Sequence, residues 1–136
     1  MKSKRVILDT NLWISFLISK KFNAIDSLIY SGKIVLIFSE ESFEEFVTVT
    51  RRPKISKYFS ESAIDELLSL FHKYGNLIKV ESNITQCRDL KDNFLLNLAI
   101  DSNADYLVTG DSDLLSLNRI NNTKIILWND FINEIR

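Results

Sequence analysis

Five short, nearly continuous apolar runs restrict the fold of this sequence more than any other feature. They are rich in β-branched residues and span residues 6–8, 34–38, 77–80, 106–108 and 124–127. Strict alternation of apolar and polar residues would indicate strands with one wet face. Continuous runs are instead typical of central parallel strands that are covered on both faces. The runs therefore predict strands of a buried, parallel sheet.

The segments between these runs carry apolar residues at helical spacing. Stripes at i, i+3, i+4 and i+7 predict helices around residues 43–50 and 64–71. A wider apolar face at residues 95–100 predicts a largely buried helix, and residues 131–135 predict a closing helix. Strands that alternate with helices indicate an α/β fold with parallel strands.

Length and composition favour a single soluble domain over residues 1–136, with an ordinary 46% of hydrophobic residues. A net charge of −1 argues against a protein that holds nucleic acid by a large basic excess. The single Cys87 excludes an intramolecular disulfide and suits a reducing cytoplasm. No apolar stretch approaches the roughly 20 residues of a membrane span. We therefore expect a cytoplasmic protein that does not contact the membrane.

Aspartates follow two of the predicted strands. Asp9 comes directly after residues 6–8, and Asp111 and Asp113 come just after residues 106–108. Asp92 stands at the start of a predicted helix, with Asp89 three residues earlier. Each acid taken alone could be a helix cap or a turn residue. Together they indicate a site, because the carboxyl ends of parallel strands meet at one edge of a sheet.

Several carboxylates at one edge repel each other, and a cation among them relieves that repulsion. Ligands that are all oxygen select hard Mg²⁺ or Mn²⁺. The lone His72 and lone Cys87 cannot form a usual zinc site, and a structural or surface role is expected for His72. Three glycines cannot form a phosphate-binding loop. Metal-dependent chemistry on an oxyanion remains, with phosphodiester hydrolysis as the leading case.

Three segments together resemble a known family. They are LDTNLWIS near the start, SEESFEEFVTVTRRPK in the first third and RDLKDNFLLNLAIDSNADYLVTGDSDLL near the end. In order and spacing they are similar to the PIN domain, over essentially the whole chain. The similarity is greatest to small prokaryotic PIN proteins described as toxins of toxin–antitoxin pairs (VapC-like ribonucleases). This resemblance implies a three-layer α/β/α sandwich with a central, mainly parallel, Rossmann-like sheet and a Mg²⁺- or Mn²⁺-dependent ribonuclease.

The resemblance also implies site residues by position. The catalytic, metal-binding acids would be Asp9, Glu45, Asp92 and Asp111, with Asp113 as a further metal ligand and with Asn11 and Thr109 as hydrogen-bonding supports. Helical spacing does not separate Glu44 from Glu45. The family register selects Glu45, which stands six residues after Ser39 and six before Arg51.

Basic residues that could contact a nucleic acid follow this acidic helix. They are Arg51, Arg52 and Lys54, for which a merely solvated surface is the competing interpretation.

The expected partners are an RNA substrate, an antitoxin protein and a second copy of the chain. A PIN-like module that binds RNA or protein without cutting is the alternative function. A receiver-type phosphoryl-transfer domain fits less well, because no lysine follows a late strand and the acids are dispersed over four segments.

Overall fold

A sheet of six strands forms the centre of the structure, a computed structural model that describes residues 3–19, 23–58, 60–83 and 90–135. The strand order is β3-β2-β1-β4-β6-β5, and every pairing is parallel except the last, between β6 and β5. The strands are β1 (Lys4–Leu8), β2 (Ile34–Ser39), β3 (Gly75–Ile78), β4 (Tyr106–Val108), β5 (Arg119–Ile120) and β6 (Thr123–Ile126). The predicted α/β class with a mainly parallel sheet is confirmed.

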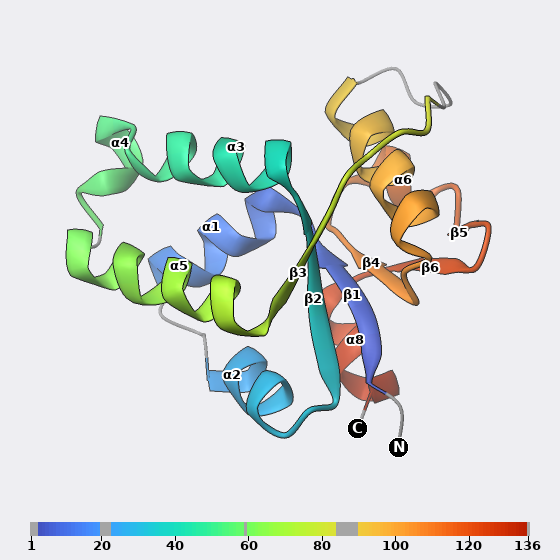
Figure 1. Ribbon diagram of the computed structural model, residues 1–136, viewed down its shortest axis with the longest axis horizontal. Coiled ribbons are helices and arrows are strands. Elements are labelled where there is room, and N and C mark those ends of the chain that lie inside the picture. The colour runs from blue at the N-terminus through green and yellow to red at the C-terminus, as the bar shows by residue number, and fades with distance from the viewer. Residues whose placement is uncertain (1–2, 20–22, 59, 84–89, 136) are drawn as a thin grey trace.

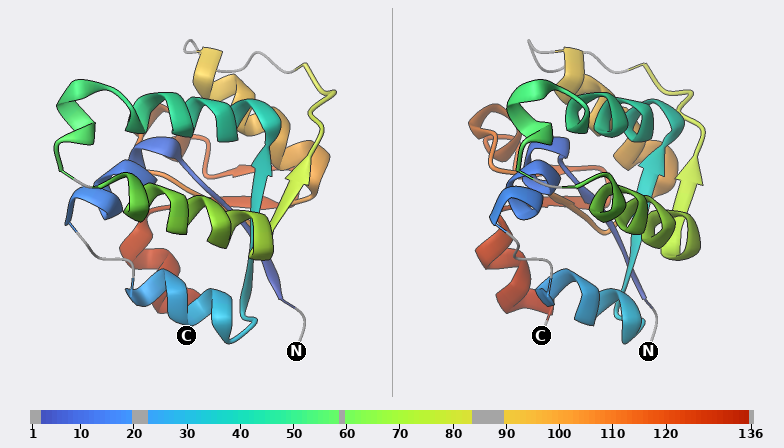
Figure 2. Two further views of the ribbon diagram at one scale, coloured as in Figure 1. Left: turned by 60° about the vertical axis from the view of Figure 1, so that its left-hand side comes forward. Right: turned by 90° about the vertical axis from the view of Figure 1, so that its left-hand side faces the viewer.

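Helices cover both faces of this sheet. They are α1 (Thr10–Ser19), α2 (Asn23–Tyr30), α3 (Glu40–Thr50), α4 (Pro53–Ser56), α5 (Glu61–Tyr74), α6 (Leu90–Ser102), α7 (Ser112–Leu115) and α8 (Trp128–Ile135). Figure 1 shows α1, α3 and α5 on one side of the strands and α6 on the other, and Figure 2 shows the molecule turned so that α1, α3 and α5 lie in front of the strands and α6 behind them. The arrangement is the predicted α/β/α sandwich. None of the described helices is both long and apolar enough to cross a membrane.

Consecutive residues of each central strand enter different cores. In β1, Val6 and Leu8 pack with residues of α1, α2, α3 and α8, whereas Ile7 packs with residues of α6 and α7. Both faces of the strand are thus apolar, which explains why its sequence is a continuous run. The prediction that residues 95–100 form a largely buried helix is also confirmed, because Leu96, Leu98 and Ala99 are fully buried.

The sequence-based boundaries differ from the structure at the edges of the sheet. The third strand was expected at residues 77–80 but spans Gly75–Ile78, because β2, its partner among the described strands, ends at Ser39, opposite Ile78. β5 was not predicted, nor were the helices α1, α2, α4 and α7. Cys87 and Asp89 lie outside the described residues.

The strand order reverses between β1 and β4. The chain adds β2 and then β3 on one side of β1, and crosses over through α6 to place β4 on the other side. Leu8 pairs with Val108 at the carboxyl ends of these two strands. The connections that leave β1 and β4 run to opposite faces of the sheet, so a crevice opens at this point. Asp9 follows the end of β1, and Asp111 comes shortly after the end of β4.

Candidate active site

Asp9 is the first residue after β1, where the chain turns into α1. Its backbone N–H donates to the Val108 carbonyl at 3.0 Å, which ties the end of β1 to the end of β4. Its Oδ1 accepts a 3.2 Å hydrogen bond from the Asn11 N–H, as the side chain of a helix-capping residue does. A carboxylate has about four lone-pair sites, and this bond uses one of them. The helix-cap interpretation and the site interpretation of Asp9 are therefore compatible.

Thr109 links the ends of the two central strands through its side chain. Its hydroxyl donates to Asp9 Oδ2 at 2.8 Å and accepts a 3.1 Å hydrogen bond from the Asp111 N–H. Its own N–H donates to the Ile126 carbonyl at 3.0 Å, and the residue is 1% exposed. One buried hydroxyl thus fixes the Asp9 carboxylate relative to the backbone of Asp111.

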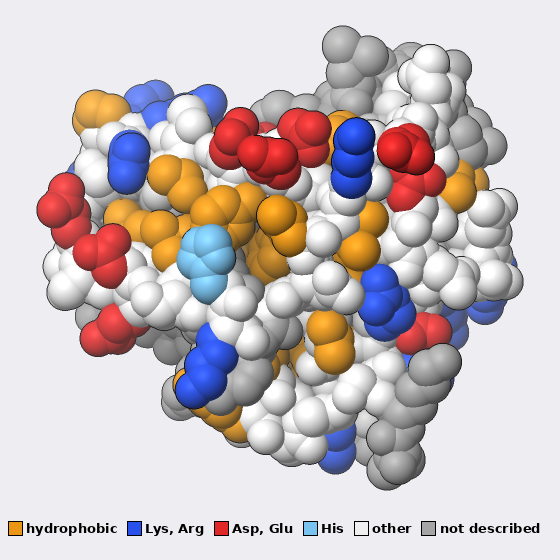
Figure 3. All heavy atoms as spheres, in the orientation of Figure 1, with side chains coloured by type: hydrophobic (Ala, Val, Ile, Leu, Met, Phe, Trp, Pro, Cys, Tyr) orange, Lys and Arg blue, Asp and Glu red, His pale blue; other side chains and the backbone are white. Residues whose placement is uncertain are grey.

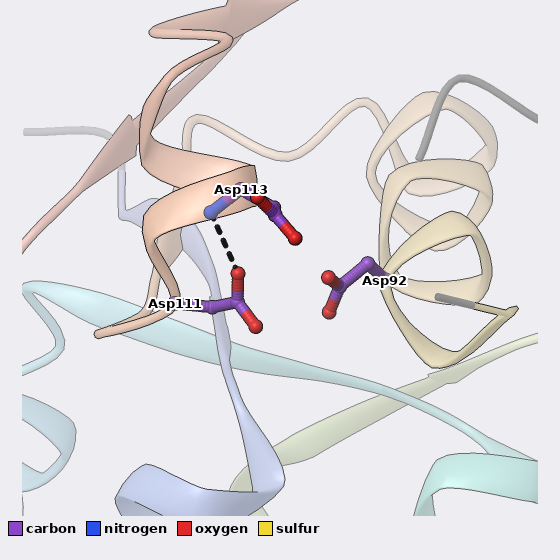
Figure 4. Close-up of side chains that lie close together, drawn as sticks. All are labelled: Asp92, Asp111 and Asp113. Carbon is purple, nitrogen blue, oxygen red and sulfur yellow. Dashed lines mark hydrogen bonds between the residues drawn. The ribbon is translucent and has the colours of Figure 1, made fainter. Parts of the chain in front are cut away.

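Asp111 caps the short helix α7. Its Oδ1 accepts hydrogen bonds from the N–H groups of Asp113 at 2.8 Å and Leu114 at 3.3 Å. One oxygen each from Asp111, Asp113 and the buried Asp92 lie within 4.8 Å of one another. Figure 4 shows the three carboxylates directed toward one another across the space between α7 and the first turn of α6.

An open pocket of about 270 Å³ lies beside this group and receives side chains from four segments of the chain. Its lining consists of Asp9, Thr10, Asn11, Glu41, Ser42, Glu45, Asp92, Phe94, Leu95 and Asp111. All four acids that the resemblance implied are therefore at one pocket. Asp113 is not in the lining, although one of its oxygens lies within 4.8 Å of oxygens of Asp92 and Asp111.

The two adjacent glutamates of α3 face different surfaces. Glu45 lines the acidic pocket, whereas the exposed Glu44 lines an apolar groove with Phe43, His72 and Leu77. Figure 3 shows this groove as an orange area beside the single histidine, with acidic side chains above it. The ring of His72 lies 5.1 Å from that of Phe43, which agrees with the expected structural or surface role.

The basic residues that were candidates for contacting nucleic acid do not line the pocket. Arg51, Arg52 and Lys54 are exposed where α3 ends and α4 begins. Arg51 follows Glu45 by six positions, a rise of about 9 Å along the axis of α3. Figure 1 shows α4 at the end of α3 that is remote from the sheet. A nucleic acid would have to extend along α3 to reach both groups.

Sequence reasoning missed two prominent members of the pocket wall, Glu41 and Phe94. Glu41 stands one turn before Glu45, so the i, i+4 spacing was a signal that both would face the same side. Ser42 also lines the pocket; it completes a reciprocal capping box with the buried Ser39 at the start of α3. That box fixes the first turn of α3, on which Glu41 lies.

The chemistry of the donor set fits a hard divalent cation. The pocket and its rim offer carboxylate oxygens from Asp9, Glu41, Glu45, Asp92, Asp111 and Asp113, and no lysine or arginine stands among the described lining residues. Oxygen ligands on opposite sides of a Mg²⁺ are about 4 Å apart. The 4.8 Å within which the three aspartate oxygens lie is close to that separation. A cation would offset the mutual repulsion of these groups.

The fold and the site together define an α/β protein with an acidic, cation-compatible pocket at the switch point of a parallel sheet. The family can be stated more narrowly, because residues 5–113 match the model of the PIN domain. The chain belongs to the PIN domain family. It is also similar to the uncharacterized protein MJ1680 of Methanocaldococcus jannaschii, with 35% identity over 96% of this chain and 90% of that protein.

Membership of this family gives the general class of activity. PIN domains are generally nucleases, hydrolases that use divalent metal ions and act on RNA or other nucleic acid. The acidic group of Asp92, Asp111 and Asp113 has the composition that such an ion requires.

Proposed function

We propose that this protein is a Mg²⁺- or Mn²⁺-dependent endoribonuclease whose catalytic acids are Asp9, Glu45, Asp92 and Asp111. The observation that carries the proposal is the shared pocket. Its acids come from the end of β1, from α3, from α6 and from Asp111, three positions after the end of β4. Four separate segments would not bring carboxylates together for helix capping alone, since a cap requires only one acid for each helix.

In this proposal the acids of the pocket would hold the divalent cation, and hydrogen bonds fix the orientation of their carboxylates. The Asp9 carboxylate is held through both of its oxygens. Oδ2 accepts from the Thr109 hydroxyl, and Oδ1 accepts from the Asn11 N–H. Asp111 uses Oδ1 for the cap of α7, which leaves its second oxygen directed toward Asp92. A divalent cation, when bound, supplies a Lewis acid that neutralises the phosphate and lowers the pKa of a water molecule.

The same acids also exclude substrate when no cation is bound. A phosphodiester carries a negative charge, and the described lining offers it carboxylates without a lysine or arginine. Coulomb repulsion therefore opposes entry of the scissile phosphate into the cation-free pocket. The exposed residues Arg51, Arg52 and Lys54 are proposed to hold more distant phosphates of the same strand.

A titration of thermal stability with Mn²⁺ tests the proposal. A ligand that binds only the folded state at 100 times its Kd stabilises that state by about 2.7 kcal/mol. We expect the melting temperature of metal-stripped protein to rise with Mn²⁺ and Mg²⁺, and RNA cleavage to appear over the same concentrations. If neither ion raises the melting temperature or gives heat in calorimetry, the catalytic proposal fails and a non-catalytic binding module is the better description.

Glu45→Gln is expected to cost far more activity than Glu44→Gln. Only Glu45 lines the pocket, whereas Glu44 lines the apolar groove on the other side of α3. The two substitutions are chemically identical and adjacent, so each is the control for the other. Initial rates of RNA cleavage at saturating Mn²⁺ provide the measurement. A larger loss from Glu44→Gln would shift the functional register of α3 by one residue.

Thr109→Val is expected to lower both stability and affinity for the cation. The isosteric change leaves the Asp111 N–H without its acceptor, at a cost of about 1–3 kcal/mol in the free energy of unfolding. It also releases the Asp9 carboxylate; loss of such an outer-shell hydrogen bond typically weakens metal binding ~10–100-fold.

Thr123→Val is the matched control for this prediction. Its buried hydroxyl donates to the Ala104 carbonyl at 2.7 Å at the start of β6, away from the pocket. Urea denaturation with and without Mn²⁺ separates the two effects. Thr123→Val should lower stability while leaving the increment from Mn²⁺ unchanged. An unchanged increment in Thr109→Val as well would show that its hydroxyl serves only the fold.

A role as the toxin of a toxin–antitoxin pair is the narrower part of the proposal. It is supported by the resemblance to small prokaryotic PIN proteins, and it adds an antitoxin protein and a second copy of the chain as partners. A small reading frame directly upstream of the gene is the observation expected. Growth arrest on expression of the chain alone, relieved by co-expression of that upstream product, would support the toxin role. Unaffected growth would contradict it.

A further inference from the structure

Phe94 has an environment opposite to that of its neighbours on α6. Seven of the eight residues from Asp92 to Ala99 are buried, among them the polar Asp92, Asn93 and Asn97. Phe94 is the one that is only half-buried. A helix that buries an aspartate and two asparagines while it leaves a phenylalanine partly exposed reverses the usual preference of these residues. Such an inversion requires a reason.

Packing of the apolar core does not provide that reason. In the described part of the chain, Phe94 belongs to neither hydrophobic core cluster, nor to the partly buried side chains packed against them. Ile100 of the same helix, also half-buried, does pack against the core that α6 and α7 share. Among the described residues, Phe94 has no aromatic ring partner. Its ring therefore contributes little to holding α6 on the sheet.

The ring lies instead at the acidic pocket. Phe94 is the sole aromatic side chain among the described lining residues, where its neighbours are carboxylates, small polar residues and Leu95. An isolated exposed apolar residue on an open surface would need no explanation. Here the ring is placed at a pocket whose other lining side chains, apart from Leu95, are charged or polar. It adds a flat, neutral surface that does not repel an anion.

We propose that Phe94 stacks on a nucleobase of a single-stranded RNA whose phosphate enters the acidic pocket. This inference rests on the proposed nuclease function and adds a residue that recognises the substrate. Every base has a π-face, so stacking on an aromatic ring tolerates any sequence. A base in a duplex is already stacked between its neighbours and does not reach a ring in a protein pocket without unstacking. Phe94 thus confers a preference for unpaired nucleotides.

The test compares Phe94→Leu, which keeps an apolar side chain, with Phe94→Tyr, which keeps the ring. The substrates are a short single-stranded oligoadenylate and an abasic strand of the same length, both in saturating Mn²⁺. Loss of one base–aromatic stack costs about 1–3 kcal/mol, or about 5- to 150-fold in affinity. We expect Phe94→Leu to lower kcat/KM for oligoadenylate by that factor, mainly through KM. Phe94→Tyr should remain within a few-fold of the unmodified protein.

The abasic strand isolates the stacking contribution. Without bases this strand cannot stack, so Phe94→Leu should cleave it as well as the unmodified protein does. The substitution in the protein and the removal of the bases from the strand together form a double-mutant cycle. A 2-aminopurine placed in the oligoadenylate gives a second readout, because stacking quenches its fluorescence. That quenching should be lost in Phe94→Leu and retained in Phe94→Tyr.

One control variant and the activity of the unmodified protein distinguish failure of the stacking role from failure of the proposed nuclease function. Tyr30→Leu removes a ring that is 64% exposed at the end of α2, on the opposite edge of the sheet, and should change neither KM nor quenching. Equal losses from Phe94→Leu on oligoadenylate and on the abasic strand, or no loss on either, would overturn the stacking role. Failure of the unmodified protein to cleave or bind either strand would instead contradict the proposed function.

Discussion

Asp111→Asn is expected to lower RNA cleavage by more than about 100-fold at every Mn²⁺ concentration. The asparagine oxygen can still accept the bonds that cap α7, so the helix should be retained. What is lost is the charge of the second oxygen, which is directed toward Asp92. Loss of a direct ligand should exceed the ~10–100-fold effect typical of outer-shell partners.

Asp113→Asn should behave differently from Asp111→Asn. Asp113 is exposed and is absent from the pocket lining, although one of its oxygens lies near those of Asp92 and Asp111. We expect it to hold a metal-bound water or a second, weaker ion, so that a higher Mn²⁺ concentration restores much of the rate. Rate measured against Mn²⁺ concentration distinguishes the two variants. An equal loss that Mn²⁺ does not rescue would make Asp113 a direct ligand, and no loss from Asp111→Asn would remove Asp111 from the site.

Asp9→Asn is expected to abolish metal-dependent cleavage and to keep or raise thermal stability. The asparagine oxygen can accept the Asn11 N–H, and its amide can donate to the Thr109 hydroxyl, which has a second lone pair available. Both hydrogen bonds therefore have replacements. Removal of one negative charge from a group of neighbouring carboxylates reduces their repulsion in the metal-free protein.

Thermal melting and cleavage assays on the same preparation give the measurement for Asp9→Asn. Melting should be recorded without added metal, where the relief of repulsion is largest. An equal loss of folding and activity would mean that Asp9 acts mainly as the cap of α1. Cleavage at the unmodified rate would exclude Asp9 from the catalytic acids.

The central sheet could be predicted because burial on both faces leaves a signature in the sequence. β1, β2, β4 and β6 each send neighbouring side chains into different cores, and their apolar runs are continuous for that reason. β5 has only two residues and carries no such run. α1 was missed because the stretch from Leu12 to Ile18 is apolar in nearly every position, which hides helical periodicity.

The candidate site could be predicted in part. Asp9 and Asp111 follow strands that end at the same sheet edge, so fold class alone brought them together. Glu45 and Asp92 come from helices, whose rotation about their axes is set by tertiary packing. Glu45 was assigned by family resemblance, whereas Asp92 was also singled out by its place at the start of a predicted helix; the catalytic roles of both stay predictions. Phe94 could not be anticipated, because in the sequence it is one more apolar residue in a run from Phe94 to Leu96.

The bond from the Thr109 hydroxyl to Asp9 joins residues 100 positions apart in the chain. We expect so long a segment to close after local structure has formed, because closing it costs more loop entropy than local contacts do. During synthesis, the first hundred residues include β1, β2, β3 and most of α6, yet they lack β4, Thr109 and Asp111. A growing chain of that length cannot assemble the complete pocket. If the proposed function is correct, a growing chain would gain its complete set of catalytic acids only after Asp111 has been synthesised.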